Sequence, residues 1–156
     1  MPTEIDWVRL AAFIDGEGMI DIHTHSQFRP HLDRVHTTHY VRIIITNTDP
    51  RLALWCKDIF DGCANFVKTS AQNSKWRNQL KWYVSSRKAV AILRGCLPYL
   101  ILKREQAEVA LAFQETVSRI GRKGHTQETL DRRIELQQKM KLLKRANPIP
   151  SDYIVH

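Results

Sequence analysis

The chain has 156 residues, of which 43% are hydrophobic, and this is enough for one globular domain with its own core. The net charge is +8, and the excess of Lys and Arg falls after residue 18, so we expect a surface that binds a polyanion, although the same charge also serves solubility. No apolar run approaches the roughly 18 residues that cross a bilayer, and the acidic segment 1–6 is unlike a signal peptide. These features argue against a membrane partner.

Three cysteines, Cys56, Cys63 and Cys96, form no CxxC pair and leave an odd number. Each has apolar neighbours in the sequence, so we expect three buried free thiols. Free thiols fit a reducing, intracellular compartment, which is the bacterial cytoplasm or an organelle.

The chain begins with a predicted helix that carries few large side chains on one face. Apolar residues at helical spacing predict this helix from about Thr3 to Ile14. The adjacent Ala11 and Ala12 leave little side-chain bulk, so a second helix can approach closely.

Two glycines follow this helix and flank an acidic residue. We expect Gly16 and Gly18 to end the helix, because glycine reaches backbone conformations that are closed to other residues. Glu17 is then presented at the end of the helix, just before a strand. A carboxylate fixed there beside exposed backbone carbonyls is a suitable ligand set for Mg²⁺, and the alternative is a helix end with incidental acids.

The rest of the chain alternates between strand and helix patterns. The expected strands are Met19–Gln27, Thr37–Asn47, Ala64–Thr69 and Gln79–Ser85, with loops over Phe28–His36 and Ala71–Asn78. The expected further helices are Pro50–Phe60, Arg87–Pro98, Leu102–Gly121 and Thr126–Ala146. The order α-β-β-α-β-β-α-α-α predicts an α+β fold, with one domain over residues 1–146 and a short tail over 147–156.

The expected antiparallel sheet has an apolar face under the helices and a polar face left open. The candidate DNA-binding residues on the open face are His23, His25, Gln27, Tyr40, Arg42, Lys68, Arg77, Gln79 and Lys81. Such side chains read base edges and neutralise phosphates, and the alternative is a solvated sheet face. His23 and His25 share a face and could begin a zinc site, but no Cys or acid at ligand spacing completes it.

The segment Leu10–Gly18 resembles the LAGLIDADG motif of homing endonucleases. Ala12 stands where the pattern has Gly, and Glu17 stands where it has the second Asp. The resemblance covers nearly the whole chain, because the family has the same α-β-β-α-β-β-α order, here with extra C-terminal helices. It implies a LAGLIDADG homing endonuclease fold whose open sheet face binds DNA.

The resemblance also implies a catalytic site. Glu17 and the Gly16 carbonyl would bind Mg²⁺, for which Mn²⁺ or Ca²⁺ substitutes in binding. Asn47 takes the place of a polar residue close to the attacking water, where a Gln is common. Arg51 and Lys103 would order solvent and stabilise negative charge in the transition state.

One motif supplies one acidic site, whereas a double-strand break needs two, so a homodimer of the single-motif type is expected. The interface would be formed by the motif helices, through Trp7, Val8, Ala11, Ala12 and Asp15. The resemblance makes Asp15 a structural residue that caps or braces the helix end near the dimer axis and does not bind metal, and Asp15 is kept as a secondary candidate for the site. The implied activity is cleavage of a long pseudo-palindromic double-stranded DNA site, leaving short 3′ overhangs, by an enzyme encoded in an intron or an intein.

Two alternatives remain open at this point. Related domains bind RNA or DNA without cutting it, as intron maturases or transcription regulators. A basic, non-catalytic dimer whose acids only cap helices is the second alternative. Metal-dependent cleavage distinguishes the enzyme from both.

Overall fold

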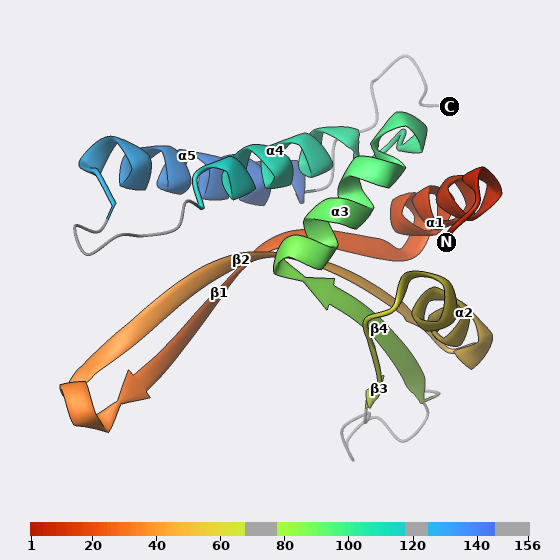
Figure 1. Ribbon diagram of the computed structural model, residues 1–156, viewed down its shortest axis with the longest axis horizontal. Coiled ribbons are helices and arrows are strands. Elements are labelled where there is room, and N and C mark those ends of the chain that lie inside the picture. Colours follow the sequence, from red (N-terminus) through yellow and green to blue (C-terminus); the bar gives the residue numbers. More distant parts are fainter. Residues whose placement is uncertain (68–77, 118–124, 146–156) are drawn as a thin grey trace, which may run out of the picture.

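The computed structural model describes residues 1–67, 78–117 and 125–145 (Figure 1). The predicted order of helices and strands is confirmed. The elements are α1 (Glu4–Glu17), β1 (Gly18–Arg29), β2 (Arg34–Asn47), α2 (Pro50–Phe60), β3 (Cys63–Val67), β4 (Gln79–Ser85), α3 (Ser86–Cys96), α4 (Arg104–Glu115) and α5 (Gln127–Leu143), with short 3₁₀ turns η1 (Pro30–Leu32) and η3 (Leu97–Tyr99). Within the described residues no helix is both long and apolar enough to cross a bilayer.

The four strands form one antiparallel sheet in the order β1-β2-β4-β3. The helices lie over one face of this curved sheet, and its other face is left open (Figure 1). The core between them contains fully buried side chains from strands and helices alike, among them Ile20, Ile43, Trp82 and Phe113. The predicted α+β class with one open sheet face is therefore confirmed.

Helix α1 is longer than the sequence predicts. Its start is fixed by a capping box, in which the Thr3 hydroxyl accepts from the Asp6 amide and the Asp6 carboxylate accepts from the Thr3 amide. It continues through Gly16, and Gly18 has an extended backbone with φ −85°. Gly18 ends the helix as predicted, but Gly16 lies within it, and the prediction that the glycines adopt conformations closed to other residues is wrong. Gly18 is needed for space, because a Cβ there would lie 2.6 Å from the Ile14 Cα.

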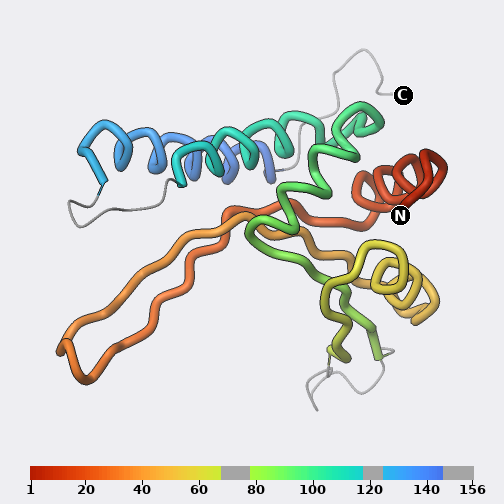
Figure 2. Tube along the Cα trace, viewed as in Figure 1, coloured from red at the N-terminus to blue at the C-terminus, as the bar shows by residue number. Residues whose placement is uncertain are grey.

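The β1–β2 hairpin extends as an arm beyond the helices (Figure 2). The predicted loop over Phe28–His36 is wrong, because β1 runs to Arg29 and β2 begins at Arg34. The turn is tight, since Asp33 adopts the left-handed conformation with φ 45° after the 3₁₀ turn. Cross-strand side-chain hydrogen bonds, such as the 3.0 Å contact between Thr24 and His39, link the two strands of the arm.

The remaining predicted boundaries are close to the observed ones. Asp49 caps α2 by accepting from the Arg51 amide, and Gly62 follows that helix with φ 101°. Strand β4 has the predicted bounds, with Leu80, Trp82 and Val84 buried. The described part of α4 is shorter than predicted. The end of the predicted strand Ala64–Thr69, nearly all of the predicted loop Ala71–Asn78 and the predicted tail 147–156 lie outside the described residues.

The cysteine prediction holds for two of the three thiols. Cys56 and Cys96 are buried and free, and burial raises the pKa of each thiol to about 12. Cys63 is exposed, so the prediction is wrong there. It pairs with Tyr83 across β3 and β4 and therefore belongs to the open face of the sheet.

Candidate functional site

Glu17 and Asn47 lie together at the edge of the sheet where β1 begins and β2 ends. Glu17 is the last residue of α1, and Asn47 is the last residue of β2. Because β1 and β2 are antiparallel, with Gly18 opposite Ile45, these two ends lie together. The Asn47 side-chain amide donates a hydrogen bond to Glu17 Oε2. The structure thus brings together two of the four predicted catalytic residues.

Lys103 lies at the same end of α1. Its Nζ donates to the Ile14 carbonyl at 2.8 Å and to the Asp15 carbonyl at 2.6 Å. The pKa of Lys103 is lowered, because the effect of burial exceeds the opposing effect of the nearby Asp15 carboxylate. The C-terminal end of a helix carries partial negative charge, and the position of this ammonium shows that the end of α1 attracts cations.

Asp15 forms bonds that suit the bracing role implied by the resemblance. Its carboxylate accepts from the Ile101 amide at 2.7 Å and from the Lys103 amide at 2.9 Å. These bonds tie the end of α1 to the segment that leads into α4. Asp15 therefore braces the helix end that carries Glu17.

Arg51 points toward Asp49. The Arg51 Nη2 lies 2.6 Å from Asp49 Oδ2, and the side chain of Arg51 is 88% exposed. The bonds from Arg51 lower the pKa of Asp49 to about 2. The Asp49 amide in turn donates to Asn47 Oδ1 at 2.7 Å, so a chain of contacts leads from Glu17 through Asn47 and Asp49 to Arg51. Asp49 is not among the predicted site residues, so the sequence analysis missed this link.

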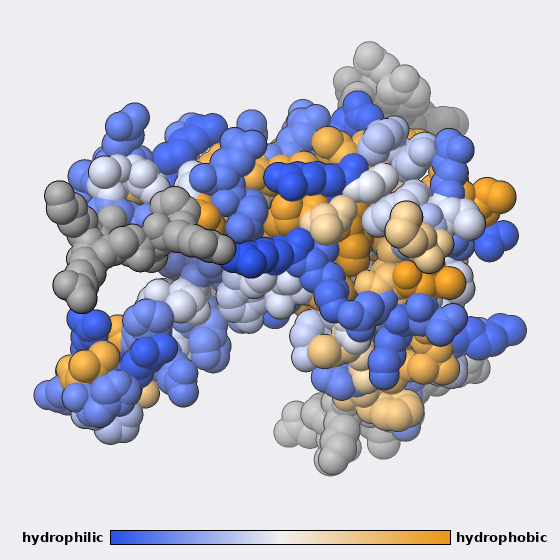
Figure 3. Space-filling model, in the orientation of Figure 1, coloured by the Kyte–Doolittle hydropathy of each residue, from blue (hydrophilic) through white to orange (hydrophobic). Residues whose placement is uncertain are grey.

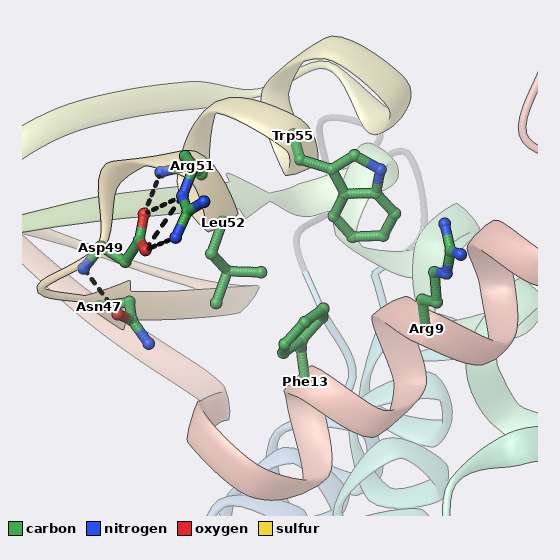
Figure 4. Close-up of a pocket in the computed structure, with 7 residues that line it drawn as sticks. All are labelled: Arg9, Phe13, Asn47, Asp49, Arg51, Leu52 and Trp55. Carbon is green, nitrogen blue, oxygen red and sulfur yellow. Dashed lines mark hydrogen bonds and ion pairs between the residues drawn. The ribbon is translucent and has the colours of Figure 1, made fainter.

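A hollow of about 500 Å³ lies beside these residues, between α1 and α2 (Figure 4). Phe13 from α1 faces Leu52 and Trp55 from α2, and the rings of Phe13 and Trp55 are 6.0 Å apart. The lining residues are Arg9, Phe13, Asn47, Asp49, Arg51, Leu52 and Trp55. One side of the hollow is therefore apolar, and the other is formed by the polar chain of contacts.

The described DNA-binding candidates all lie on the open face of the sheet. Residues that are directly opposite in an antiparallel pair share a face, and His23 is opposite Tyr40 while Lys81 is opposite Thr46. The candidates on this face are His23, His25, Gln27, Tyr40, Arg42, Gln79 and Lys81. Lys68 and Arg77 lie outside the described residues.

Two further residues join this face that the sequence analysis did not single out. Asp21 Oδ2 accepts from Arg42 Nη2 at 3.0 Å, and Asp21 Oδ1 accepts from Lys144 Nζ at 3.0 Å. The pKa of His23 is lowered, mainly by burial and secondly by the charge of Arg42. Its Nδ1 lies 4.0 Å from Asp21 Oδ2, whose charge acts in the opposite direction. Lys144 is 123 positions from Asp21, so no local pattern could have predicted their contact.

No protein-family model and no curated protein matches the chain. Solved structures do match it. The homing endonuclease I-CvuI, in complex with its target, is 21% identical with a TM-score of 0.69, and the match covers 92% of this chain and 85% of that chain. The archaeal intron-encoded homing endonuclease I-Vdi141I, complexed with DNA, is 13% identical with a TM-score of 0.66, covering 93% and 87%. The LAGLIDADG homing endonuclease I-LtrWI, bound to target DNA, is 20% identical with a TM-score of 0.60, covering 84% and 42%.

The chain has the LAGLIDADG homing endonuclease fold. The resemblance of the segment Leu10–Gly18 is thereby confirmed at the level of the fold, and α1 is the helix that carries the motif. The chain spans about half the length of I-LtrWI but most of the length of I-CvuI.

The outer side of the LAGLIDADG motif helix is apolar and exposed. Ile5 is 63% exposed, Val8 is 44% exposed, and Ala12 and Gly16 are exposed beside them. In the view of Figure 3, several hydrophobic residues lie over the end of the molecule formed by α1 and α2, interspersed with hydrophilic ones. Val8 and Ala12 are predicted interface residues, whereas the sequence analysis missed Ile5.

The other predicted interface residues are used inside the chain. Ala11 is fully buried in the core of its own domain, so its side chain cannot contact a second copy. The ring of Trp7 packs edge-on against Phe60 at 5.0 Å and lies over Gly95. Asp15 accepts the two backbone bonds described above. Of the predicted interface set, Val8 and Ala12 are the exposed members.

The end of the LAGLIDADG motif helix fits a divalent metal ion in its chemistry. Glu17 offers exposed carboxylate oxygens, Gly16 is exposed beside it, and the neighbouring carbonyls already hold the Lys103 ammonium. Among the described residues, no three His, Cys, Asp or Glu side chains form a metal-binding group.

Proposed function

We propose that this protein is a homing endonuclease, which cuts both strands of a long pseudo-palindromic DNA site as a metal-dependent homodimer. The observation that carries the proposal is the Glu17–Asn47 contact at the end of the motif helix, beside an open, cationic sheet face. The fold supplies the context, since the structures of I-CvuI, I-Vdi141I and I-LtrWI were each determined with DNA.

Binding of double-stranded DNA is supported by the chemistry of the open face. Its side chains include Arg42, Lys81 and Gln79, which read guanine and adenine edges in a major groove. The concave shape of the sheet suits a curved duplex surface, as strand-based readers of DNA show. The cations also neutralise phosphates, so affinity should fall steeply with salt.

Homodimer formation is supported by three independent features. The match covers 85% of the length of I-CvuI but only 42% of the length of I-LtrWI. The exposed stripe of Ile5, Val8 and Ala12 on α1 gives a self-complementary surface for a twofold axis. The apolar hollow lined by Phe13 and Trp55 lies beside that stripe.

The catalytic arrangement follows from the contacts at the end of α1. Mg²⁺, for which Mn²⁺ or Ca²⁺ substitutes in binding, would be held by Glu17 and the Gly16 carbonyl and would supply an activated water and charge relief at the phosphate. I-CvuI structures were determined with 2 mM Ca or 2 mM Mg. Asn47 holds the Glu17 carboxylate in one orientation, and Asp49 holds the Asn47 amide.

Lys103 and Arg51 would contribute positive charge on either side of the acid. Lys103 keeps its ammonium at the end of α1, within the same cluster as Glu17. Arg51 is exposed, and releasing it from Asp49 would let it approach a phosphate.

By resemblance to the family, cleavage leaves short 3′ overhangs. The buried free thiols of Cys56 and Cys96 support an intracellular, reducing location.

The test is cleavage selection on a library of long randomised inverted repeats with Mg²⁺, followed by sequencing of the cut ends. We expect one pseudo-palindromic family of sites with staggered ends. Glu17→Ala should abolish cutting while DNA binding and thermal stability persist. Glu108→Ala is the matched control, because it removes an exposed acid of α4, and it should cut like the wild type. Cutting by Glu17→Ala would show that the site assignment is wrong.

A second candidate function is a non-cleaving nucleic-acid binder, either an intron maturase or a transcription regulator. Its support is that both predicted catalytic cations are already engaged, Arg51 by Asp49 and Lys103 by backbone carbonyls. In the same selection, retention of particular sequences without cut ends would favour this candidate.

A further inference from the structure

Asp21 is an unusual residue for a surface that binds a polyanion. It is the only acidic residue in the four described strands, and it lies on the open face. Its side chain is only 17% exposed, and both of its carboxylate oxygens are occupied. One oxygen binds Arg42 from the neighbouring strand, and the other binds Lys144 from the far end of the chain.

Lys144 reaches the sheet because α5 lies antiparallel along α4. Leu136 and Met140 are the buried residues on the inner side of α5. The Gln106 side chain of α4 donates a hydrogen bond to the Leu143 carbonyl at 3.3 Å. These contacts fix the last turn of α5, and Lys144 directly follows it as the C-cap. The lysine is therefore placed by packed structure and has only to extend its side chain to Asp21.

Arg42 is held by Asp21 on one edge and faces a hollow of the open sheet. The hollow has a volume of about 230 Å³, and its lining residues are Tyr40, Arg42, Ile44, Lys81, Tyr83 and Ser85. The Nη2 of Arg42 is fixed by Asp21, whereas its Nε is buried without a hydrogen-bond partner among the described residues. The Arg42 side chain as a whole is 22% exposed, so guanidinium hydrogens other than the buried Nε–H remain for a base edge.

We propose that Asp21 and Lys144 are positioning residues that hold Arg42 in one orientation for reading a base, so that α5 contributes to sequence discrimination. The inference rests on the proposed DNA-binding function and deepens it. Arg42 is the group that contacts DNA, and the two other residues act through it. Lys144 also cancels the one negative charge of the sheet, so that Arg42 keeps its net attraction for DNA.

Two other roles for the same residues make different predictions. A free carboxylate on this face would accept from a cytosine amino group, but both oxygens of Asp21 already accept from cations. A lysine that only contacts a phosphate would raise affinity equally for all sequences and would add about one unit to the salt slope. Positioning instead changes discrimination at the base pairs that Arg42 reads.

The experiment is a binding selection with the full chain and Ca²⁺, using duplexes that carry randomised inverted repeats. Arg42→Gln first identifies the base positions that depend on Arg42. Lys144→Met removes the charge and keeps the length, Lys144→Arg restores the charge, and Lys141→Met is the control on the same helix. The winning duplex and a scrambled duplex are then titrated by fluorescence anisotropy at several salt concentrations, and the thermal midpoint of each variant is measured.

We expect Lys144→Met to relax the same base positions as Arg42→Gln and to reduce the ratio of affinities for the winning and scrambled duplexes by about fivefold or more. Lys144→Arg should restore the ratio, and Lys141→Met should leave it unchanged. An equal loss of affinity for both duplexes, or a ratio like that of Lys141→Met, would overturn the proposal. If the wild type binds no duplex, the proposed function itself fails.

Discussion

Replacing Asp15 tests how the end of the motif helix is held. The carboxylate joins α1 to the segment before α4 through the Ile101 and Lys103 amides. Asp15→Ala removes both acceptors and leaves two amides without a partner. Asp15→Asn keeps the shape but replaces one acceptor oxygen by a donor, so it should retain only one of the two bonds.

The size of the effect follows from the two distances, 2.7 and 2.9 Å. Hydrogen bonds to a charged group contribute about 1.5–3 kcal/mol each, and the partial exposure of Asp15 places these near the lower end. We therefore expect Asp15→Ala to lower the free energy of unfolding by about 2–3 kcal/mol. For a chain of this size, that loss corresponds to a fall of roughly 4–12 °C in the thermal midpoint.

The assay is urea unfolding followed by circular dichroism, at one fixed protein concentration because a homodimer is stabilised by mass action. The matched control is Asp58→Ala, which removes an exposed acid of α2 and the same charge. Asp15→Asn should fall between Asp15→Ala and the control. If Asp15→Ala unfolds at the same urea concentration as Asp58→Ala, the two bonds do not brace the helix end and the reasoning is refuted.

Two further predictions concern packing and pH. Gly95→Ala should destabilise the fold by roughly 1–3 kcal/mol in urea unfolding, because its Cβ would lie 2.5 Å from the Trp7 ring, and an unchanged midpoint would contradict this contact. Although burial raises the pKa of Asp21, the hydrogen bonds and charges of Lys144 and Arg42 outweigh it and lower the pKa below 3.8. A lowered carboxyl pKa contributes stability above pH 3.8 that is lost as the pH falls through the folded-state pKa, so the stability difference between wild type and Asp21→Asn should shrink below about pH 4.

Where a strand covers the core, the sequence predicted it accurately. In β4 the apolar residues Leu80, Trp82 and Val84 alternate with polar ones, and the predicted bounds are the observed ones. The alternation is sharp because one face is buried and the other is open. The start of α2 was equally clear, since Asp49 caps the helix through its own side chain.

The tip of the hairpin arm could not be predicted in the same way. Beyond Ile22, the strand β1 leaves the core, and the residues from Thr24 to Phe28 are exposed on both faces. Without a buried face, no alternation of apolar and polar residues is required, so the sequence predicted the strands only as far as Gln27 and from Thr37 onward, with a loop for the tip between them. Hydrogen bonds such as those between Thr24 and His39, and the left-handed Asp33, support the arm instead.

In the candidate site, too, some contacts could be predicted from the sequence and others could not. Glu17 and Asn47 follow from the ends of two paired strands, so sequence order places them together. The contacts that support them do not follow from sequence order. Asp15 meets Ile101 across 86 positions, and these bonds depend on how α1 and α4 pack. Local spacing cannot reveal them.

The adjacent Ala11 and Ala12 show why the motif helix has to be considered as two faces. Consecutive helical residues point about 100° apart, so two neighbouring alanines cannot both face a second helix. Ala11 is buried in its own core, which lets α1 lie close to the sheet and brings Glu17 to the end of β2. Ala12 is exposed, in line with Ile5 and Val8, and leaves the outer side of α1 open to close approach. The same pair of small residues therefore serves the placement of the acid within one chain and, in the proposed dimer, the distance between two such acids.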